Sequence, residues 1–172
     1  MKYNYSYQPK DESKAALALG LSVDASSRHG KEVSNLIRGR KVDDAVKILQ
    51  GVISLKIAVP YRNYKTDLSH KTGVGPARFP IKTSQAILDV IKNAIANAQQ
   101  KGLNSADLVL KHLSVQKASC PWRAGRKGRR KAKRVHIEVV LEPYEAESAE
   151  KKKAKDNFKN RPFKKHKSGG NR

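Results

Sequence analysis

The residues of this sequence best suited to chemistry are cations gathered in one short stretch. Residues 117–134, KASCPWRAGRKGRRKAKR, hold nine Lys or Arg among eighteen residues and no acidic residue. Five of the nine are arginines, whose guanidinium groups bind phosphate through paired hydrogen bonds and stack on bases. Trp122 adds a ring on which a base can stack. The chemistry that this segment favours is the binding of a phosphate backbone.

Two alternating runs flank the cationic segment and would hold its base. Residues 109–116 and 135–142 alternate in polarity, which predicts two antiparallel strands that form the arms of one hairpin. Folded back on itself in two limbs of nine residues, the segment between them could project about 30 Å, at about 3.3 Å per residue. Because such an arm has no apolar face, we expect RNA or DNA to support it. The alternative is a solvated, disordered basic loop, which the flanking strands disfavour.

The whole chain is basic. It has 37 Lys or Arg against 15 Asp or Glu in 172 residues, a formal net charge of +22, which predicts a polyanionic partner. No run of 18 or more apolar residues exists, and the N-terminus is polar and rich in tyrosine. We therefore expect a soluble intracellular protein with no membrane partner.

No catalytic or metal-binding set of residues stands out. Cys120 is the only cysteine, so an internal disulfide and a cysteine-based zinc site are excluded, and it has no base nearby. Glu138 and His136 face opposite ways on one predicted strand and His112 lies on the other, so no acid–base pair is evident. The sequence predicts a protein that is not an enzyme and that needs no metal or cofactor.

The rest of the chain supplies a small set of elements. Residues 15–24 alternate as a half-buried strand, and helices are predicted over residues 27–38 and from Val42 onward, with Pro60 as the outer limit. Residues 82–101 give the clearest helix, with an apolar stripe that we assign to the core.

Two segments lack the periodicity of the predicted helices and strands. Residues 60–80 hold three prolines, two glycines and three aromatic residues, and they are predicted to be a loop whose rings either stack on RNA or cover a core edge. Residues 144–172 are basic, with few apolar residues, and are expected to be disordered without RNA. The predicted organisation is one globular domain over residues 1–143, with the hairpin at 117–134 and a tail.

Five short motifs occur in the order of a known family. They are SNLIRGRKVDDAV at 34–46, VPYR at 59–62, GPARFP at 75–80, RAGR at 123–126 and HIEVVL at 136–141. With them the chain resembles the universal ribosomal protein family called L-twenty-two in bacteria and L-seventeen in eukaryotes, in its archaeal and eukaryotic branch. The resemblance spans about residues 15 to 142.

This resemblance implies an α+β fold, in which three helices pack on a small three-stranded antiparallel sheet that carries a long hairpin. It also implies a structural role in the large subunit of cytoplasmic ribosomes, with ribosomal RNA and neighbouring ribosomal proteins as partners. The hairpin tip, between Pro121 and Arg130, would line the exit tunnel and meet the nascent peptide. The alternative is a free-standing RNA chaperone or a chromatin-type protein.

The expected RNA contacts are the hairpin residues together with cations of the helices and the loop. These are Arg28, Arg38, Arg40, Lys41, Arg62, Lys65, Arg78, Lys82, Lys117, Trp122, Arg123, Arg126, Lys127, Arg129, Arg130, Lys131, Lys133 and Arg134.

Overall fold

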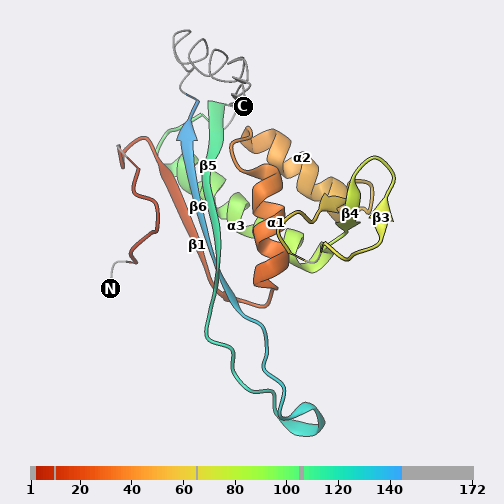
Figure 1. Ribbon diagram of the computed structural model, residues 1–172. Helices are drawn as coiled ribbons and strands as arrows, with labels where there is room; N and C mark the ends of the chain where they lie inside the picture. The colour runs from red at the N-terminus through yellow and green to blue at the C-terminus, as the bar shows by residue number, and fades with distance from the viewer. Residues whose placement is uncertain (1–2, 10, 65, 105–106, 145–172) are drawn as a thin grey trace, which may run out of the picture.

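The structure, a computed structural model, describes residues 3–9, 11–64, 66–104 and 107–144 (Figure 1). Its elements in chain order are β1 (Ala16–Val23), α1 (Ser27–Ile37), α2 (Val42–Ile53), β2 (Val59–Pro60), β3 (His70–Lys71), β4 (Gly75–Arg78), α3 (Ile81–Gln100), β5 (Leu108–Lys117) and β6 (Val135–Pro143). The predicted tail lies, apart from Tyr144, outside the described residues.

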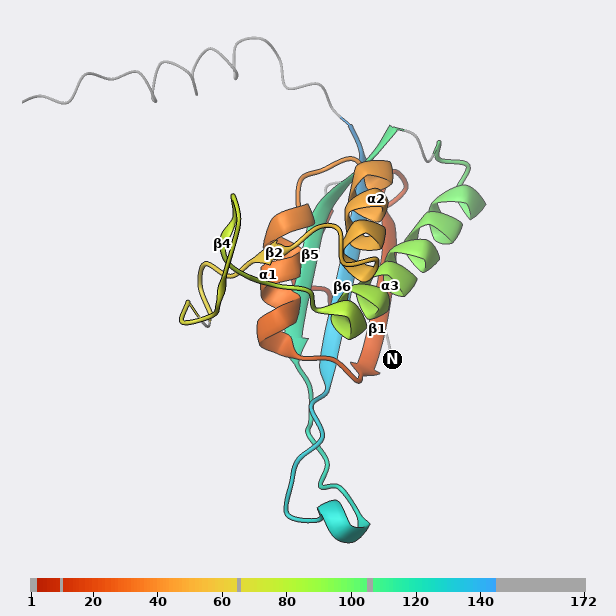
Figure 2. The same ribbon diagram turned by 90° about the vertical axis from the view of Figure 1, so that its right-hand side faces the viewer.

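The main sheet has three antiparallel strands in the order β1-β6-β5, so the last of the described strands lies in the middle. All three helices cover one face of this sheet, and the hairpin between β5 and β6 projects from one end (Figure 2). The predicted α+β class, with three helices on a three-stranded sheet and an extended hairpin, is confirmed.

Strand β1 presents its small residues to the helices. Ala16 and Ala18 are buried in the core, while Leu17 on the other face is only half-buried. Small side chains here allow α3 to lie close, since a Cβ added to Gly20 would stand 2.8 Å from a Val90 methyl group. The alternation was predicted, but it does not reveal which side of the strand is covered.

Strand β5 breaks the alternation that the sequence suggested. The pairing with β6 shifts register between Leu110 and His112, which is a β-bulge. Because the bulge inserts one residue, Leu110 and Leu113 both face the core, although strict alternation would put them on opposite sides. The predicted assignment of Val109 and Leu113 to one face was therefore wrong.

The helices match their predicted positions within one residue at each boundary where both ends were predicted. Helix α1 packs against β5, and α2 packs against α3, so the core lies between the helix layer and the sheet. The apolar stripe of α3 is core as predicted, with Ile87, Ile91, Ala94 and Ala98 fully buried.

The segment 60–80 is more ordered than the predicted loop. It forms a second antiparallel sheet with the order β2-β4-β3, in which Val59 pairs with Arg78 and His70 pairs with Pro76. These strands have two to four residues each, too few for an alternation to register in the sequence.

Candidate nucleic-acid interface

The cationic arm 117–134 continues the pairing of β5 and β6 beyond the sheet. Near its base the Ala118 N–H donates to the Arg134 carbonyl at 2.9 Å, and farther out the Arg123 N–H donates to the Arg130 carbonyl at 2.8 Å. The arm is thus a two-stranded extension with its own backbone hydrogen bonds, and it reaches well clear of the helices (Figure 1).

A single 3₁₀ turn, Gly125–Lys127, closes the tip of the arm. The Gly128 N–H donates to the Gly125 carbonyl at 2.8 Å, and Gly125 has a φ of +69°, in a region that favours glycine. The tip therefore falls inside the stretch between Pro121 and Arg130 that the family resemblance implied.

The side chains of the arm face solvent. Trp122 is 64% exposed, and the Nζ of Lys131 lies 4.8 Å from its ring centroid, within the range of a cation–π contact. Arg134 and Ala132 are half-buried, and nothing is described for the side chain of Lys127. The remaining cations of the arm are exposed: Lys117, Arg123, Arg126, Arg129, Arg130, Lys131 and Lys133. Among the described residues, no ion pair involves a cation of the arm.

Two clefts at the base of the arm share Ser26, Lys131 and Lys133. One has a volume of about 320 Å³ and the other of about 530 Å³. Seven of the predicted contact residues line one or both of them: Arg28, Lys82, Lys117, Arg123, Lys131, Lys133 and Arg134. The base of the arm is therefore where helix cations and arm cations come together.

Three other predicted residues lie at the opposite end of the sheet. Arg38, Arg40 and Lys41 surround the turn between α1 and α2, which is joined to β5 by hydrogen bonds from the Gly39 N–H to the Leu110 carbonyl, at 2.8 Å, and back from the Leu110 N–H to Arg40, at 2.9 Å. Figure 1 shows this turn at the end away from the arm. These predicted contact residues are thus separated from those at the arm by the length of the sheet.

Two of these arginines also make contacts inside the protein. The Arg38 guanidinium donates to the Leu113 carbonyl at 2.6 Å, and Arg40 donates through Nε to the Leu36 carbonyl at 2.9 Å. Because a guanidinium has five N–H donors, both residues keep donors for a further partner.

Glu32, which sequence reasoning missed, shapes the loop that follows β2. It is 2% exposed, and its carboxylate accepts hydrogen bonds from the backbone N–H groups of Arg62, Asn63 and Tyr64 at 3.3, 3.0 and 2.9 Å. These partners lie at least 30 residues away, so no local signal could reveal them. Arg62 is exposed beside this anchor.

Two other predicted contacts come from the same segment. Arg78 is exposed on β4, and Lys65 lies outside the described residues.

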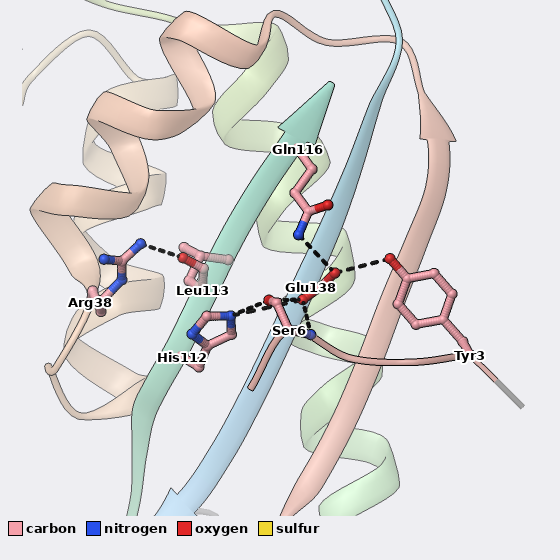
Figure 3. Close-up of polar contacts among 7 residues, drawn as sticks. All are labelled: Tyr3, Ser6, Arg38, His112, Leu113, Gln116 and Glu138. Atoms are coloured by element: carbon pink, nitrogen blue, oxygen red, sulfur yellow. Dashed lines mark hydrogen bonds and ion pairs between the residues drawn. The ribbon is translucent and has the colours of Figure 1, made fainter. Parts of the chain in front are cut away.

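A cluster on the outer face of the sheet overturns one expectation. Figure 3 shows Glu138 of β6 with His112 of β5 and the N-terminal residues Tyr3 and Ser6 around it. Glu138 is 1% exposed and accepts hydrogen bonds from the Tyr3 hydroxyl at 2.9 Å, the Ser6 N–H at 3.0 Å, the Ser6 hydroxyl, and the Gln116 amide at 3.2 Å. His112 Nε2 lies 3.8 Å from Glu138 Oε2, so a histidine of one arm meets an acid of the other, a pair that was not evident in the sequence.

This cluster has the composition of a catalytic triad without its geometry. His112 Nε2 and the Glu138 carboxylate both contact the same Ser6 hydroxyl, the former at 3.1 Å. In a triad the carboxylate would instead hold the second ring nitrogen and leave the first to activate the serine. The arrangement therefore serves to attach the N-terminal segment to the sheet.

Protonation in the cluster follows from burial and hydrogen bonding. Burial lowers the pKa of His112 and Arg38 lowers it further, while Glu138 opposes both, so the imidazole is neutral at pH 7. Burial by itself would raise the pKa of Glu138, but the hydrogen bonds from Ser6 and Tyr3 outweigh it and the pKa is lowered.

Within the described part of the chain, no group of three or more His, Cys, Asp or Glu residues could hold a metal ion. No helix among the described residues combines the length and the apolar character that crossing a membrane requires.

Comparison with known proteins gives a consistent result. Residues 18–142 match a family described as ribosomal protein L22p/L17e. Similar proteins include two named large ribosomal subunit protein uL22, from Archaeoglobus fulgidus (38% identical, covering 67% of this chain and 77% of the relative) and from Methanothrix thermoacetophila (40% identical, covering 81% and 96%). A third of the same name, from Methanocaldococcus jannaschii, is 35% identical over 84% of this chain and 96% of its own length.

Proposed function

Since the chain belongs to the ribosomal protein L22p/L17e family, we propose that it is a structural constituent of the large ribosomal subunit, where it binds large-subunit ribosomal RNA. Its arm lines the tunnel through which the nascent peptide leaves. The family is one of structural ribosomal proteins, and the protein is accordingly not an enzyme.

The observation that carries the RNA-binding part of the proposal is the exposed arm. An extension 18 residues long, with nine cations and no carboxylate, has no apolar surface that a protein core would cover. RNA offers phosphates that neutralise these cations and release counterions, and it offers bases for guanidinium and indole stacking. The cations at the base of the arm adjoin this surface, and those at the α1–α2 turn form a separate cationic group at the other end of the sheet.

The proposal also says where the tip of the arm lies in the ribosome and which partners the globular part has. In this proposal the turn at Gly125–Lys127 faces the tunnel lumen and contacts the nascent peptide, while the globular part adjoins neighbouring ribosomal proteins in the cytoplasmic ribosome. A photoreactive amino acid in place of Arg126, an exposed residue of this turn, should cross-link to nascent chains in translating ribosomes. Cross-links to ribosomal RNA alone would refute the lumen-facing tip.

The RNA-binding part is tested by replacing Arg126, Arg129 and Arg130 with Ala. Each phosphate contact that is lost should flatten the dependence of log affinity on log salt by about one unit of slope. The measurement is filter binding to transcribed large-subunit ribosomal RNA over a series of salt concentrations. The matched control removes the same charge from exposed positions on the helix side, with Lys47, Lys56 and Lys92 changed to Ala.

Two outcomes would contradict the proposal. An unchanged slope in the arginine variant would show that these side chains do not meet phosphate. Competition by duplex DNA as strong as by ribosomal RNA, together with failure to sediment with large subunits at moderate salt, would instead favour a free-standing nucleic-acid-binding protein.

A further inference from the structure

The smaller cleft at the base of the arm has a mixed chemistry that a simple phosphate site does not need. It lies between the turn after β1, the first turn of α3 and the arm, and its volume is about 320 Å³. Lys82, Arg123, Lys131 and Lys133 line it, and so does one carboxylate, that of Asp24. A carboxylate repels phosphate, so a ligand of this cleft that meets Asp24 must do so through hydrogen-bond donors.

Asp24 is open to such a contact. Its side chain is 43% exposed and pairs with that of Lys82, which is 70% exposed, so a ligand can reach both groups. The hydrogen bond from Lys82, together with the charges of Lys82, Arg134 and Arg123, lowers the pKa of Asp24 despite some burial. At neutral pH the group is a carboxylate and only accepts hydrogen bonds.

The cleft also offers a ring and hydroxyl groups. The ring of His29 lines it and stands edge-on to the fully buried Tyr61, with ring centroids 5.6 Å apart and an interplanar angle of 89°. Ser26 and Thr83 line the cleft beside it. Proteins that read RNA use such rings to stack unpaired bases and use polar groups to read the base edge and the 2′-hydroxyl.

We propose that this cleft holds one unstacked guanine nucleotide of the bound RNA, with its phosphates on Arg123, Lys131 and Lys133 and its base edge on Asp24. Guanine fits because its N1–H and exocyclic amine are adjacent donors, which pair with the two oxygens of a carboxylate. Uracil presents a single donor on that edge. The inference rests on the proposed RNA-binding function and adds to it a base that the protein reads.

The test uses the full chain and three single-stranded heptamers of uridine, whose central residue is guanosine, inosine or uridine. Inosine keeps the N1–H of guanosine and lacks its amine. Fluorescence anisotropy should show the guanosine heptamer bound at least about fivefold more tightly than the uridine heptamer, as expected for a paired contact to a base edge, with the inosine heptamer in between.

Two cleft variants separate base reading from charge. Asp24→Asn should abolish the preference for guanosine while affinity for the uridine heptamer is retained or increased, because a negative charge is removed. Lys131→Ala should weaken all three heptamers and leave the preference intact. The control is Asp89→Asn, which removes the same charge from the exposed face of α3, outside the cleft. Thermal melts of all variants confirm that they are folded.

Results that would overturn the guanine site differ from results that would overturn RNA binding itself. Equal affinity for the three heptamers, a preference that survives in Asp24→Asn, or no heptamer binding by a protein that still binds large-subunit RNA would each overturn the guanine site alone. Loss of binding to large-subunit RNA in the parent protein would overturn the RNA-binding function itself.

Discussion

At the scale of single residues, two buried carboxylates organise this basic protein. Glu32 gathers three backbone N–H groups of the loop after β2, and Glu138 gathers the N-terminal segment onto the sheet. A buried carboxylate is costly unless hydrogen bonds satisfy it, and here the partners come from distant parts of the sequence. Each acid therefore joins a peripheral segment to the core rather than contacting a ligand.

Replacing Glu138 by Gln should lower the free energy of unfolding by about 1–3 kcal/mol, because the amide cannot accept all the hydrogen bonds that the carboxylate accepts and one donor is left unsatisfied. Urea unfolding at pH 7 measures this. Glu142→Gln on the same strand is the control, since Glu142 accepts a hydrogen bond from the Tyr7 hydroxyl at 3.0 Å, and this variant should lose less than about 1 kcal/mol. Equal losses in the two variants would contradict a special role for Glu138.

The same residue predicts a dependence of stability on pH. The pKa of Glu138 is lower in the folded protein than in the unfolded chain, so the folded state binds fewer protons there. Its stabilisation is complete above the unfolded pKa of about 4.3 and is lost as pH falls through the lower folded pKa. The free energy of unfolding should thus decline more steeply below pH 5 in the parent than in Glu138→Gln. Parallel curves for the two proteins would refute this.

At the scale of elements, the sequence predicted the regular helices and strands, but it did not predict the bulge or the short strands. The helices and the three long strands were predicted from their periods, because each is long enough to repeat its pattern. The bulge between Leu110 and His112 leaves no signature in composition, so the faces of β5 were misassigned. Strands as short as Val59–Pro60 depend on pairing with β4, which the sequence does not display.

The sequence predicted the candidate interface in part. Charge density identified the arm, but the gathering of Lys82 with Arg123 and Lys133 depends on where α3 begins relative to the sheet. Asp24 was not among the predicted contact residues, because a lone acid in a turn gives no sign of a binding role until its neighbours in space are known. The meeting of His112 with Glu138 escaped prediction because it depends on the register of β5 against β6, in which His112 pairs with Val140 and Ser114 pairs with Glu138.

Helix α3 offers a matched pair of core and surface positions. Ile91 is fully buried and Ile81 is 43% exposed, so the same change to Ala should have different effects. Ile91→Ala should cost about 2–5 kcal/mol through lost burial and the cavity left behind, and Ile81→Ala should cost much less. Thermal and urea unfolding measure both. Similar melting temperatures for Ile91→Ala and the parent would contradict its core placement.

At the scale of the whole molecule, the formal charge of +22 opposes compactness when the protein is free. Added salt screens this repulsion, so the unfolding midpoint of the isolated protein should rise as NaCl increases from about 0.02 to 0.5 M, a range over which the Debye length falls several-fold. Differential scanning calorimetry provides the measurement, with the Arg126, Arg129 and Arg130 to Ala variant as a comparison that should respond less. A midpoint independent of salt would show that self-repulsion does not limit stability.

The order of strands in the main sheet has a consequence for how the protein is made. Within the main sheet β1 and β5 both neighbour β6, the last of the described strands, so this sheet cannot assemble until residues 135–143 have been synthesised. Cotranslational folding is thereby confined to the helices and the small sheet, and the large sheet closes in one late step across a wide sequence separation. During most of its synthesis the polypeptide therefore carries an unpaired, apolar first strand that must not aggregate.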